Sequence, residues 1–199
     1  MPAYIFDDLL LKGVRNGQIP GMTEVSKKWY RQQAQKTTMT PGRLMREDAT
    51  RLKNKTGIGQ MAMFFYDPKH KKTLPFYDKF PCIFLIKQLP DGFLGINLHY
   101  LPVPLRAKLM DALYELTSNK KMNEATKLKI SYEILNGASK YKWFKPTVKR
   151  YLNKHVRSRF LHIAASEWDM AMTLPVAQWE KASQSAVYKE SRAIISGSK

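Results

Sequence analysis

The sequence of 199 residues contains a single cysteine, Cys82. One thiol cannot form an internal disulfide or supply a thiolate-rich metal site, which fits a reducing intracellular environment. Cys82 begins the apolar run Cys-Ile-Phe-Leu-Ile. We therefore expect it to be a small buried hydrophobic residue rather than a nucleophile, because an apolar strand raises the pKa of a thiol.

Long apolar runs are also missing. No stretch of the chain approaches the ~20 apolar residues that a membrane-spanning helix needs. The first residues, Met-Pro-Ala-Tyr-Ile-Phe-Asp-Asp, lack the basic region that opens a signal peptide. The sequence therefore predicts no membrane partner.

Recognised catalytic motifs are absent as well. The chain has no H-E-x-x-H, no G-x-S-x-G, no P-loop and no glycine-rich dinucleotide fingerprint. A magnesium-dependent nuclease needs clustered carboxylates beside a lysine, and the nearest approach is too loosely spaced: Asp67, Asp78 and Asp91, with Lys69, Lys79 and Lys87. We interpret His99, at the end of a predicted strand, as a hydrogen-bonded and partly buried histidine. The prediction is a protein that is not an enzyme and has no metal site and no cofactor.

Acidic residues are scarce relative to basic ones. The chain carries 34 Lys and Arg against 16 Asp and Glu, which gives a formal net charge of +18. Nucleic acid is the usual partner of such a chain, and an anionic membrane surface is the second choice. A basic surface can also serve solubility or meet an acidic neighbouring protein, so this alternative stays open.

The positive charge is densest between Lys127 and Arg159, where ten Lys and Arg stand against one acid, Glu133. Aromatic residues alternate with these cations, and their rings can stack on bases while the cations neutralise phosphates. Trp143 is expected to stack on an exposed terminal base pair. The candidate nucleic-acid-binding residues are Lys140, Lys142, Trp143, Lys145, Lys149, Arg150, Lys154, Arg157 and Arg159. A second basic segment, residues 67–73, is either a phosphate-binding loop or a solvated hairpin tip.

Glycine and proline divide the chain into three parts. Residues 1–58 are expected to form an extended basic N-terminal arm with short helices at 3–12, 23–36, where Thr23 is the N-cap, and 41–54. Residues 59–190 are expected to form a single α+β domain. The end, residues 191–199, is expected to be a loose tail.

Within the domain, the residue pattern predicts strands at 61–66, 80–87 and 93–100. The turn chemistry of residues 88–92 predicts an antiparallel hairpin between the last two. The expected fold is α+β: a small, strongly bent antiparallel sheet or partial barrel at about 61–100, with 156–163 as a further strand, packed by helices. Helices are predicted at 105–116, 123–137, 146–153 and 166–174, and a last one is expected to begin at Pro175.

Several strings of residues carry a resemblance to a known family. They are Met63 to Lys69 (MFFYDPK), Leu74 to Pro81 (LPFYDKFP), Gly92 to Pro102 (GFLGINLHYLP) and Leu135 to Lys140 (LNGASK). Together they resemble small structural proteins of T-even-like contractile-tailed phages, and among these the proteins labelled DNA end protector. The resemblance covers residues 59–179 and leaves the arm unmatched. It implies a non-enzymatic virion component on or near the packaged genome, present in the host cytoplasm before assembly, and it supplies no catalytic residues.

Three functions remain in competition. The first is a virion protein that binds or protects the ends of double-stranded DNA through sequence-independent phosphate contacts. The second is a tail, neck or baseplate subunit whose basic face and arm contact other virion proteins, with a homo-oligomer in a symmetric particle as a further expectation. The third is a DNA-processing enzyme.

Overall fold

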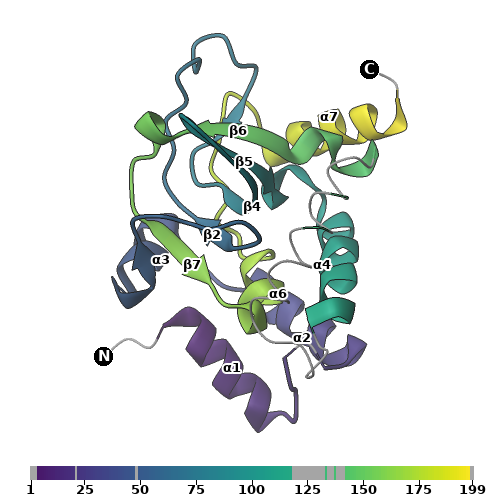
Figure 1. Ribbon diagram of the computed structural model, residues 1–199. Coiled ribbons are helices and arrows are strands. Elements are labelled where there is room, and N and C mark those ends of the chain that lie inside the picture. Colours follow the sequence, from purple (N-terminus) through teal and green to yellow (C-terminus); the bar gives the residue numbers. More distant parts are fainter. Residues whose placement is uncertain are drawn as a thin grey trace.

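A computed structural model describes residues 4–20, 22–47, 49–117, 133, 137 and 142–197, with the backbone alone for 112–117 and 142–143. The chain is α+β (Figure 1). Its elements, in chain order, are α1 (Ile5–Arg15), α2 (Glu24–Gln35), α3 (Pro41–Glu47), η1 (Ala49–Arg51), β1 (Leu52–Lys53), β2 (Met61–Met63), β3 (Tyr77–Asp78), β4 (Cys82–Leu89), β5 (Gly92–Asn97), η2 (Leu98–Tyr100), α4 (Val103–Thr117), η3 (Lys142–Thr147), β6 (Val148–Leu152), η4 (Asn153–His155), β7 (Phe160–Ile163), η5 (Ala165–Glu167), α6 (Trp168–Ala171), β8 (Trp179–Glu180) and α7 (Gln184–Ser196).

Six strands form one antiparallel sheet in the order β1-β7-β2-β4-β5-β6, and β3 and β8 form a separate pair. The sheet is open, with β1 and β6 at its edges. The β4–β5 hairpin predicted around residues 88–92 is confirmed, and its register shifts between Leu85 and Lys87. Such an irregularity increases the local twist and bend of a sheet. The predicted antiparallel sheet, including the returning strand β7, is therefore confirmed.

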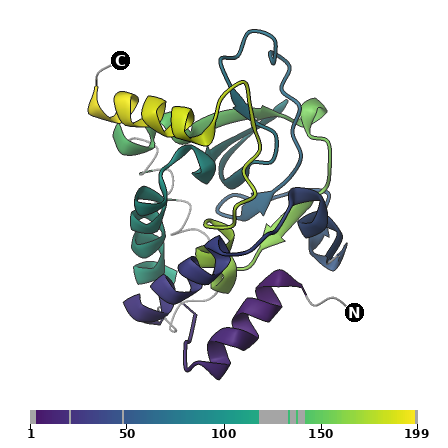
Figure 2. The ribbon, with the colours of Figure 1, turned by 180° about the vertical axis from the view of Figure 1, so that it is seen from behind.

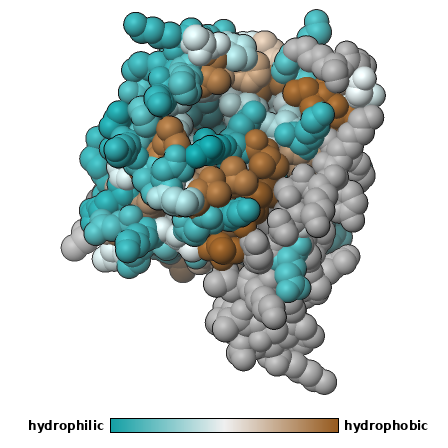
Figure 3. All heavy atoms as spheres, turned by 45° about the horizontal axis from the view of Figure 1, so that its top comes forward, coloured by the Kyte–Doolittle hydropathy of each residue, from teal (hydrophilic) through white to brown (hydrophobic). Residues whose placement is uncertain are grey.

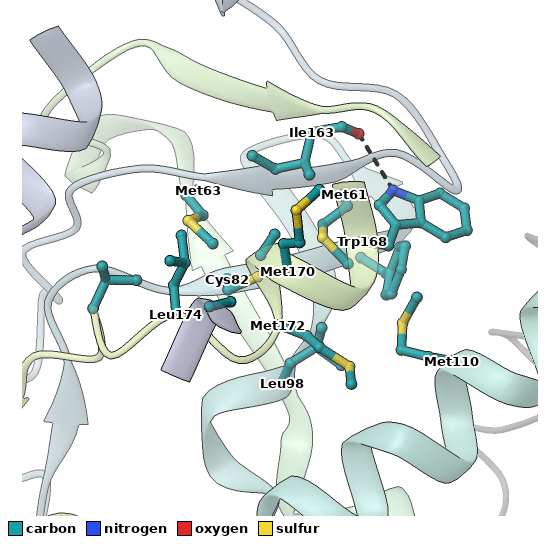
Figure 4. Packing of buried hydrophobic residues seen from close by; sticks show 14 of the residues in the cluster. Met61, Met63, Cys82, Leu98, Met110, Ile163, Trp168, Met170, Met172 and Leu174 are labelled. Atoms are coloured by element: carbon teal, nitrogen blue, oxygen red, sulfur yellow. Dashed lines mark hydrogen bonds between the residues drawn. The ribbon is translucent and has the colours of Figure 1, made fainter. Parts of the chain in front are cut away.

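The main hydrophobic core lies between one face of this sheet and the helices. Figure 4 shows Met61 and Met63 of the sheet facing Met170 and Met172, with Trp168 beside them. The indole Nε1 of Trp168 donates a hydrogen bond to the carbonyl of Ile163 at 3.3 Å. Methionine side chains are flexible enough to fill the irregular space between a bent sheet and a short helix.

Cys82 belongs to the same core, as expected. The residue is fully buried, and this burial raises the pKa of its thiol to about 12. The thiolate that reactivity requires is therefore scarce at neutral pH. Cys82 is confirmed as a small buried hydrophobic residue.

The extended N-terminal arm is not confirmed. Phe6, Tyr30 and Leu44, from α1, α2 and α3, are buried in the same cluster as the sheet residues, and residues 52–53 form the edge strand β1. Figure 2 shows these helices packed on the rest of the molecule. Large apolar residues are few in this part of the sequence, but their helical spacing puts them on buried faces. The domain boundary predicted at residue 58 stays a prediction.

Arginines of the N-terminal helices form ion pairs with carboxylates elsewhere in the fold. Arg31 of α2 donates to Asp111 of α4 and to Asp169 of α6, both at 2.6 Å. Arg51 donates to both carboxylate oxygens of Glu167 at 2.7 Å. These guanidinium groups are compensated inside the molecule, so part of the positive charge of the chain serves the fold. The predicted N-cap is confirmed, since the Thr23 hydroxyl accepts a hydrogen bond from the amide of Ser26 at 3.0 Å.

A substitution in α3 tests whether these helices are part of the cooperative fold. Leu44→Ala is expected to lower the free energy of unfolding by about 2–5 kcal/mol, because it leaves a cavity in the main core. Leu11→Ala is the matched control, since Leu11 is 56% exposed and the same change there should stay within about 0.5 kcal/mol. Denaturant unfolding followed by far-UV and near-UV circular dichroism measures both. Equal stability of the two variants would show that α3 is not part of the core.

Several local predictions were wrong. Residues 146–153 form the end of η3 and then β6, not a helix, because residues 148–152 pair with β5. The helix expected from Pro175 is replaced by β8 and the later helix α7, which is capped by Ser183. The end is not a loose tail from residue 191, because α7 continues to Ser196 and ends at Gly197, whose φ of 77° suits glycine.

Other elements came close to their predictions. The helix at 105–116 corresponds to α4, and the helix at 166–174 is split into η5 and the shorter α6. The strand at 93–100 ends at Asn97, where the Asn97 side chain accepts from the amide of His99 and caps η2. Of the helix predicted at 123–137, the structure describes only residues 133 and 137, which are both helical; the rest lies outside the described residues. Within the described residues, no helix is both long and apolar enough to cross a membrane.

The opposite face of the sheet carries a second, aromatic cluster. The ring of Phe64 lies 4.9 Å from that of Phe160, 5.4 Å from that of Tyr151 and 5.8 Å from that of Phe93, measured between centroids. Tyr66 closes the group at 4.9 Å from Tyr151. Edge-to-face contacts of this kind are favourable for aromatic rings. The cluster fixes the position of β6 and of the segment that follows β2.

Candidate nucleic-acid interface

The predicted site residues follow one continuous part of the chain. Lys140 lies outside the described residues, and for Lys142 and Trp143 the structure describes the backbone of η3 but not the side chains. The remaining six run from η3 through the edge strand β6 and η4 to the start of β7: Lys145, Lys149, Arg150, Lys154, Arg157 and Arg159. We call residues 145–159 the cationic segment. Figure 1 shows it in green, crossing the top of the molecule as β6 and then descending to β7.

The basic loop at residues 67–73 lies against this segment. The amide of Asp67 donates to the carbonyl of His155 at 3.0 Å, and the carbonyl of Asp67 is 2.7 Å from Nδ1 of His155. Tyr66 and Val156 form an antiparallel bridge next to them. Two basic stretches almost ninety residues apart in the sequence therefore meet at residues 66–67 and 155–156, which brings the exposed Lys69 and Lys72 close in the chain to this contact.

Some of these cations have carboxylate partners and others have none. Arg150 donates to both oxygens of Asp91 at 2.8 Å, and this hydrogen bond lowers the pKa of the Asp91 carboxyl. Asp67 pairs with Lys71 at 2.9 Å and with Arg157 at 3.7 Å. By contrast, five exposed cations form no ion pair within the part of the chain that the structure describes: Lys69, Lys72, Lys145, Lys154 and Arg159.

The exposed cations of the cationic segment and the basic loop thus differ from Arg31 and Arg51 of the N-terminal helices. Arg31 and Arg51 are held by buried carboxylates and contribute to packing, whereas the five cations named above face solvent. Charges of one sign that are not compensated within the protein repel one another and attract an external polyanion. This surface can therefore hold phosphate groups.

A cavity of about 680 Å³ opens beside the cationic segment. Residues 66–78, strand β6 and helix α7 form most of its lining, and Asp91, Asn97, Tyr100 and Pro146 complete it. Figure 3 looks onto this end of the molecule and shows apolar side chains among hydrophilic ones. Most of the lining is aromatic or aliphatic, and Lys69, His70, Lys149 and Arg150 add basic groups.

Lys149 differs from the other cations because it is only partly exposed. It lies on the same face of β6 as Tyr151 and opposite Gly95 of β5. Its Nζ is 4.0 Å from the centroid of the Tyr100 ring, which is a cation–π distance. Burial lowers the pKa of Lys149 to about 8. Within the described residues, no carboxylate forms an ion pair with it.

A buried polar group lies at the wall of this cavity. Asp78 is 4% exposed, and its Oδ2 is 2.6 Å from Nδ1 of His99 and accepts from Asn97 at 3.2 Å. Its Oδ1 accepts from the amides of Phe80 and Gln178. The interpretation of His99 as a hydrogen-bonded histidine is thus confirmed. Asp78 points inward, and its neighbour in the sequence, Lys79, pairs with Glu180 instead.

The loose carboxylate cluster does not assemble. Asp67, Asp78 and Asp91 are each bound to different partners. Among the described residues, no three His, Cys, Asp or Glu side chains meet in a way that could hold a metal ion.

Sequence reasoning missed the contribution of three tyrosines to the cavity: Tyr66, Tyr100 and Tyr151. They stand on three different elements, and only the pairing of β5 with β6 and the bridge at Tyr66 bring them together. The alternation of Lys149 and Tyr151 along a strand would have placed both on one face, but residues 146–153 were expected to be helical.

Comparison with known proteins gives one match. Residues 10–195 match the family model described as "Phage T4 terminal DNA protecting protein". No curated protein matches the chain, and no solved structure matches it. The matched span includes α2 and α3 as well as the sheet, and therefore extends beyond the residues on which the resemblance in the sequence rested.

Proposed function

The chain belongs to the family of the phage T4 terminal DNA protecting protein, and from this premise we propose that it binds the ends of double-stranded DNA through sequence-independent phosphate contacts. The family is one of phage structural proteins that protect DNA. The proposal adds the part of the surface that makes the contact: the cationic segment together with the basic loop.

One observation carries the proposal: five exposed cations lie along the cationic segment and the basic loop that contacts it, and none of them forms an ion pair within the described residues. They are Lys69 and Lys72 of the basic loop and Lys145, Lys154 and Arg159 of the cationic segment. Each cation that neutralises a phosphate releases condensed counterions, which is the main source of sequence-independent affinity for DNA. Arg150 and Arg157 flank them and keep donors free, because a guanidinium group has five N–H donors.

The placement of these cations supports contacts with phosphates rather than with bases. The five stand on short 3₁₀ turns and on loops, not along one face of a helix that could enter the major groove. Contacts with phosphates fix the position of a protein on a duplex and carry no sequence information. A protein that binds DNA ends of any sequence needs no sequence preference.

A charge-matched pair of variants tests the proposal. The triple variant Lys145→Gln/Lys154→Gln/Arg159→Gln is expected to bind linear duplex DNA about 100-fold more weakly at physiological salt, since each lost phosphate contact costs about fivefold under those conditions. It should also lose protection of a linear duplex against an exonuclease. The control is Lys28→Gln/Lys36→Gln/Arg46→Gln, which removes the same charge from exposed positions on or next to α2 and α3.

The two variants separate a local effect from one of net charge. Fluorescence anisotropy of a labelled duplex measures the affinities, and circular dichroism verifies that both variants are folded. The control is expected to stay within a few-fold of the wild type. If both variants lost the same affinity for duplex DNA, the loss would come from the change in net charge and not from the cationic segment. That result would overturn the proposal.

Other partners stay predictions. These are proteins of the neck, tail or baseplate and further copies of this chain. The N-terminal helices and the turn between them carry exposed apolar side chains on which such contacts could form, among them Val14 and Val25, which are 65% and 69% exposed. Single exposed apolar residues are common on protein surfaces, however, and do not identify a partner.

A further inference from the structure

The cavity beside the cationic segment has the size of a small-ligand site. Its volume of about 680 Å³ falls within the range of about 300–1,000 Å³ that is typical of pockets for small molecules and cofactors. A DNA duplex cannot enter a space of this size, but one nucleotide can. The lining joins many apolar and aromatic groups to a few polar ones, as such pockets commonly do.

We propose that this cavity binds the terminal nucleotide of an unpaired DNA strand, with the ammonium group of Lys149 at its phosphate and an aromatic wall against its base. The inference rests on the proposed function and deepens it, because it states how an end differs from the interior of a duplex. Nothing in the charge of the cationic segment alone makes that distinction.

The case for a phosphate begins with Lys149. Its ammonium group lies over the ring of Tyr100 at 4.0 Å, and within the described residues it forms no ion pair. The carboxylates that line the cavity are engaged elsewhere: Asp91 binds Arg150, both oxygens of Asp78 accept hydrogen bonds, and Glu190 is not free either. A partly buried cation of this kind is stabilised by an anion that enters from solvent.

The case for a base rests on the aromatic wall. Five aromatic residues from four parts of the chain line the cavity: Tyr66, Phe76, Tyr77, Tyr100 and Tyr151. Rings stack on bases of any sequence, because every base has a π face. The same wall therefore suits a terminal nucleotide whatever its identity, in keeping with sequence-independent contacts along the duplex.

The case for an end rests on the cost of exposing a nucleotide. A base inside a duplex must be unpaired and unstacked before it can enter a cavity, which costs a few kcal/mol of free energy. This cost is smallest for a nucleotide that is already single-stranded. The cavity lies directly beside Arg150 of the cationic segment. A duplex held by that segment can thus place an overhanging nucleotide at the cavity mouth.

The stability of the protein gives an independent readout. Burial lowers the pKa of Lys149 from 10.5 to about 8, so at neutral pH the folded protein bears the full cost of this charge, and the cost falls as the pH rises from about 8 toward 10.5. Lys149→Met is expected to raise the free energy of unfolding at neutral pH and to weaken its rise with pH above 8. If the lysine instead stabilised the fold, Lys149→Met would lower the free energy of unfolding at neutral pH. The other titratable and charged groups that line the cavity are Tyr66, Lys69, His70, Tyr77, Asp78, Asp91, Tyr100, Arg150, Tyr151 and Glu190.

The test compares four DNA duplexes of the same sequence and length in anisotropy titrations. One is closed by hairpins at both ends, one is blunt, one has a short 3′ overhang and one a short 5′ overhang. The wild type is expected to prefer at least one overhang over the closed duplex by roughly tenfold, the value of one stacked base. Lys149→Met should lose this preference and keep its affinity for the closed duplex within a few-fold. Lys145→Met, which removes an exposed cation of the same segment, should weaken binding to all four duplexes alike and keep the preference.

Two results would overturn the inference. One is a wild type that binds open and closed duplexes equally, and the other is a Lys149→Met variant that loses affinity for all four duplexes in the same proportion, as for a simple phosphate contact. Both leave the phosphate contacts of the proposed function standing, because salt-sensitive binding to the closed duplex tests those contacts separately. A wild type that binds none of the four duplexes would instead overturn the proposed function, and the inference with it.

Discussion

Raising the salt concentration from 50 to 200 mM is expected to lower the affinity of this protein for linear duplex DNA by roughly 10³–10⁵-fold. That range corresponds to a protein that makes about six to ten phosphate contacts. The five exposed cations, together with Arg150 and Arg157, supply groups in this number. The plot of log affinity against log salt concentration should be linear.

The slope of this plot also identifies the residues that make the contacts. Each phosphate contact contributes about 0.9 to the slope, so the triple variant at Lys145, Lys154 and Arg159 should lower it by about 2.7. The control variant at Lys28, Lys36 and Arg46 should leave it unchanged. Affinities from anisotropy at several salt concentrations suffice. A wild-type affinity that does not change with salt concentration would contradict the proposed phosphate contacts. It would favour the alternative in which the basic surface binds other proteins.

Phe64→Ala is expected to lower the free energy of unfolding by about 3–5 kcal/mol, a large fraction of the 5–15 kcal/mol that typically stabilises a domain. Phe64 is fully buried, and its ring touches those of Phe160, Tyr151 and Phe93. Its removal leaves a cavity between β2, β5, β6 and β7 that the remaining rings cannot fill without moving. Equilibrium denaturation measures the loss.

The neighbouring Phe65→Ala is the matched control for this substitution. Phe65 points to the other face of the strand, is only half-buried and packs against Phe80 at 4.8 Å. A smaller loss is therefore expected from the same change in side chain. Equal losses at both positions would mean that the aromatic cluster contributes no more than the periphery of the main core. Because Tyr151 of the cluster lines the cavity, Phe64→Ala should also weaken any preference for overhanging ends.

Strand β6 shows how much of the candidate site could be predicted from the sequence. The density of cations in residues 127–159 is a matter of composition and is read directly from the sequence. The same residues were expected to form a helix after Pro146, yet residues 148–152 are a strand. A segment with valine and tyrosine has the propensity for a strand, but its state was decided by pairing with β5, more than fifty residues earlier. Pairings over such distances leave no local signal.

Asp78 shows the same limit for a single side chain. In the sequence it stands beside Lys79, and nothing in that local context indicates that Asp78 is buried. In the fold it is buried against His99 and Asn97, residues that β5 and η2 bring to it. Lys149 shows this limit as well. In the sequence it resembles the exposed lysines nearby, and only the aromatic rings that the fold places around it make it partly buried.

The sequence by itself determined the charge of the protein, the resemblance to phage proteins, the β4–β5 hairpin and the cap at Thr23. Each depends on residue counts or on residues close together in the chain, where backbone preferences and turn chemistry act directly. The tertiary structure alone decided that the N-terminal helices complete the main core, that the basic loop lies against the cationic segment, and that a cavity holds Lys149 among tyrosines. These features arise from contacts between distant segments, whose energies depend on shape and burial rather than on local sequence.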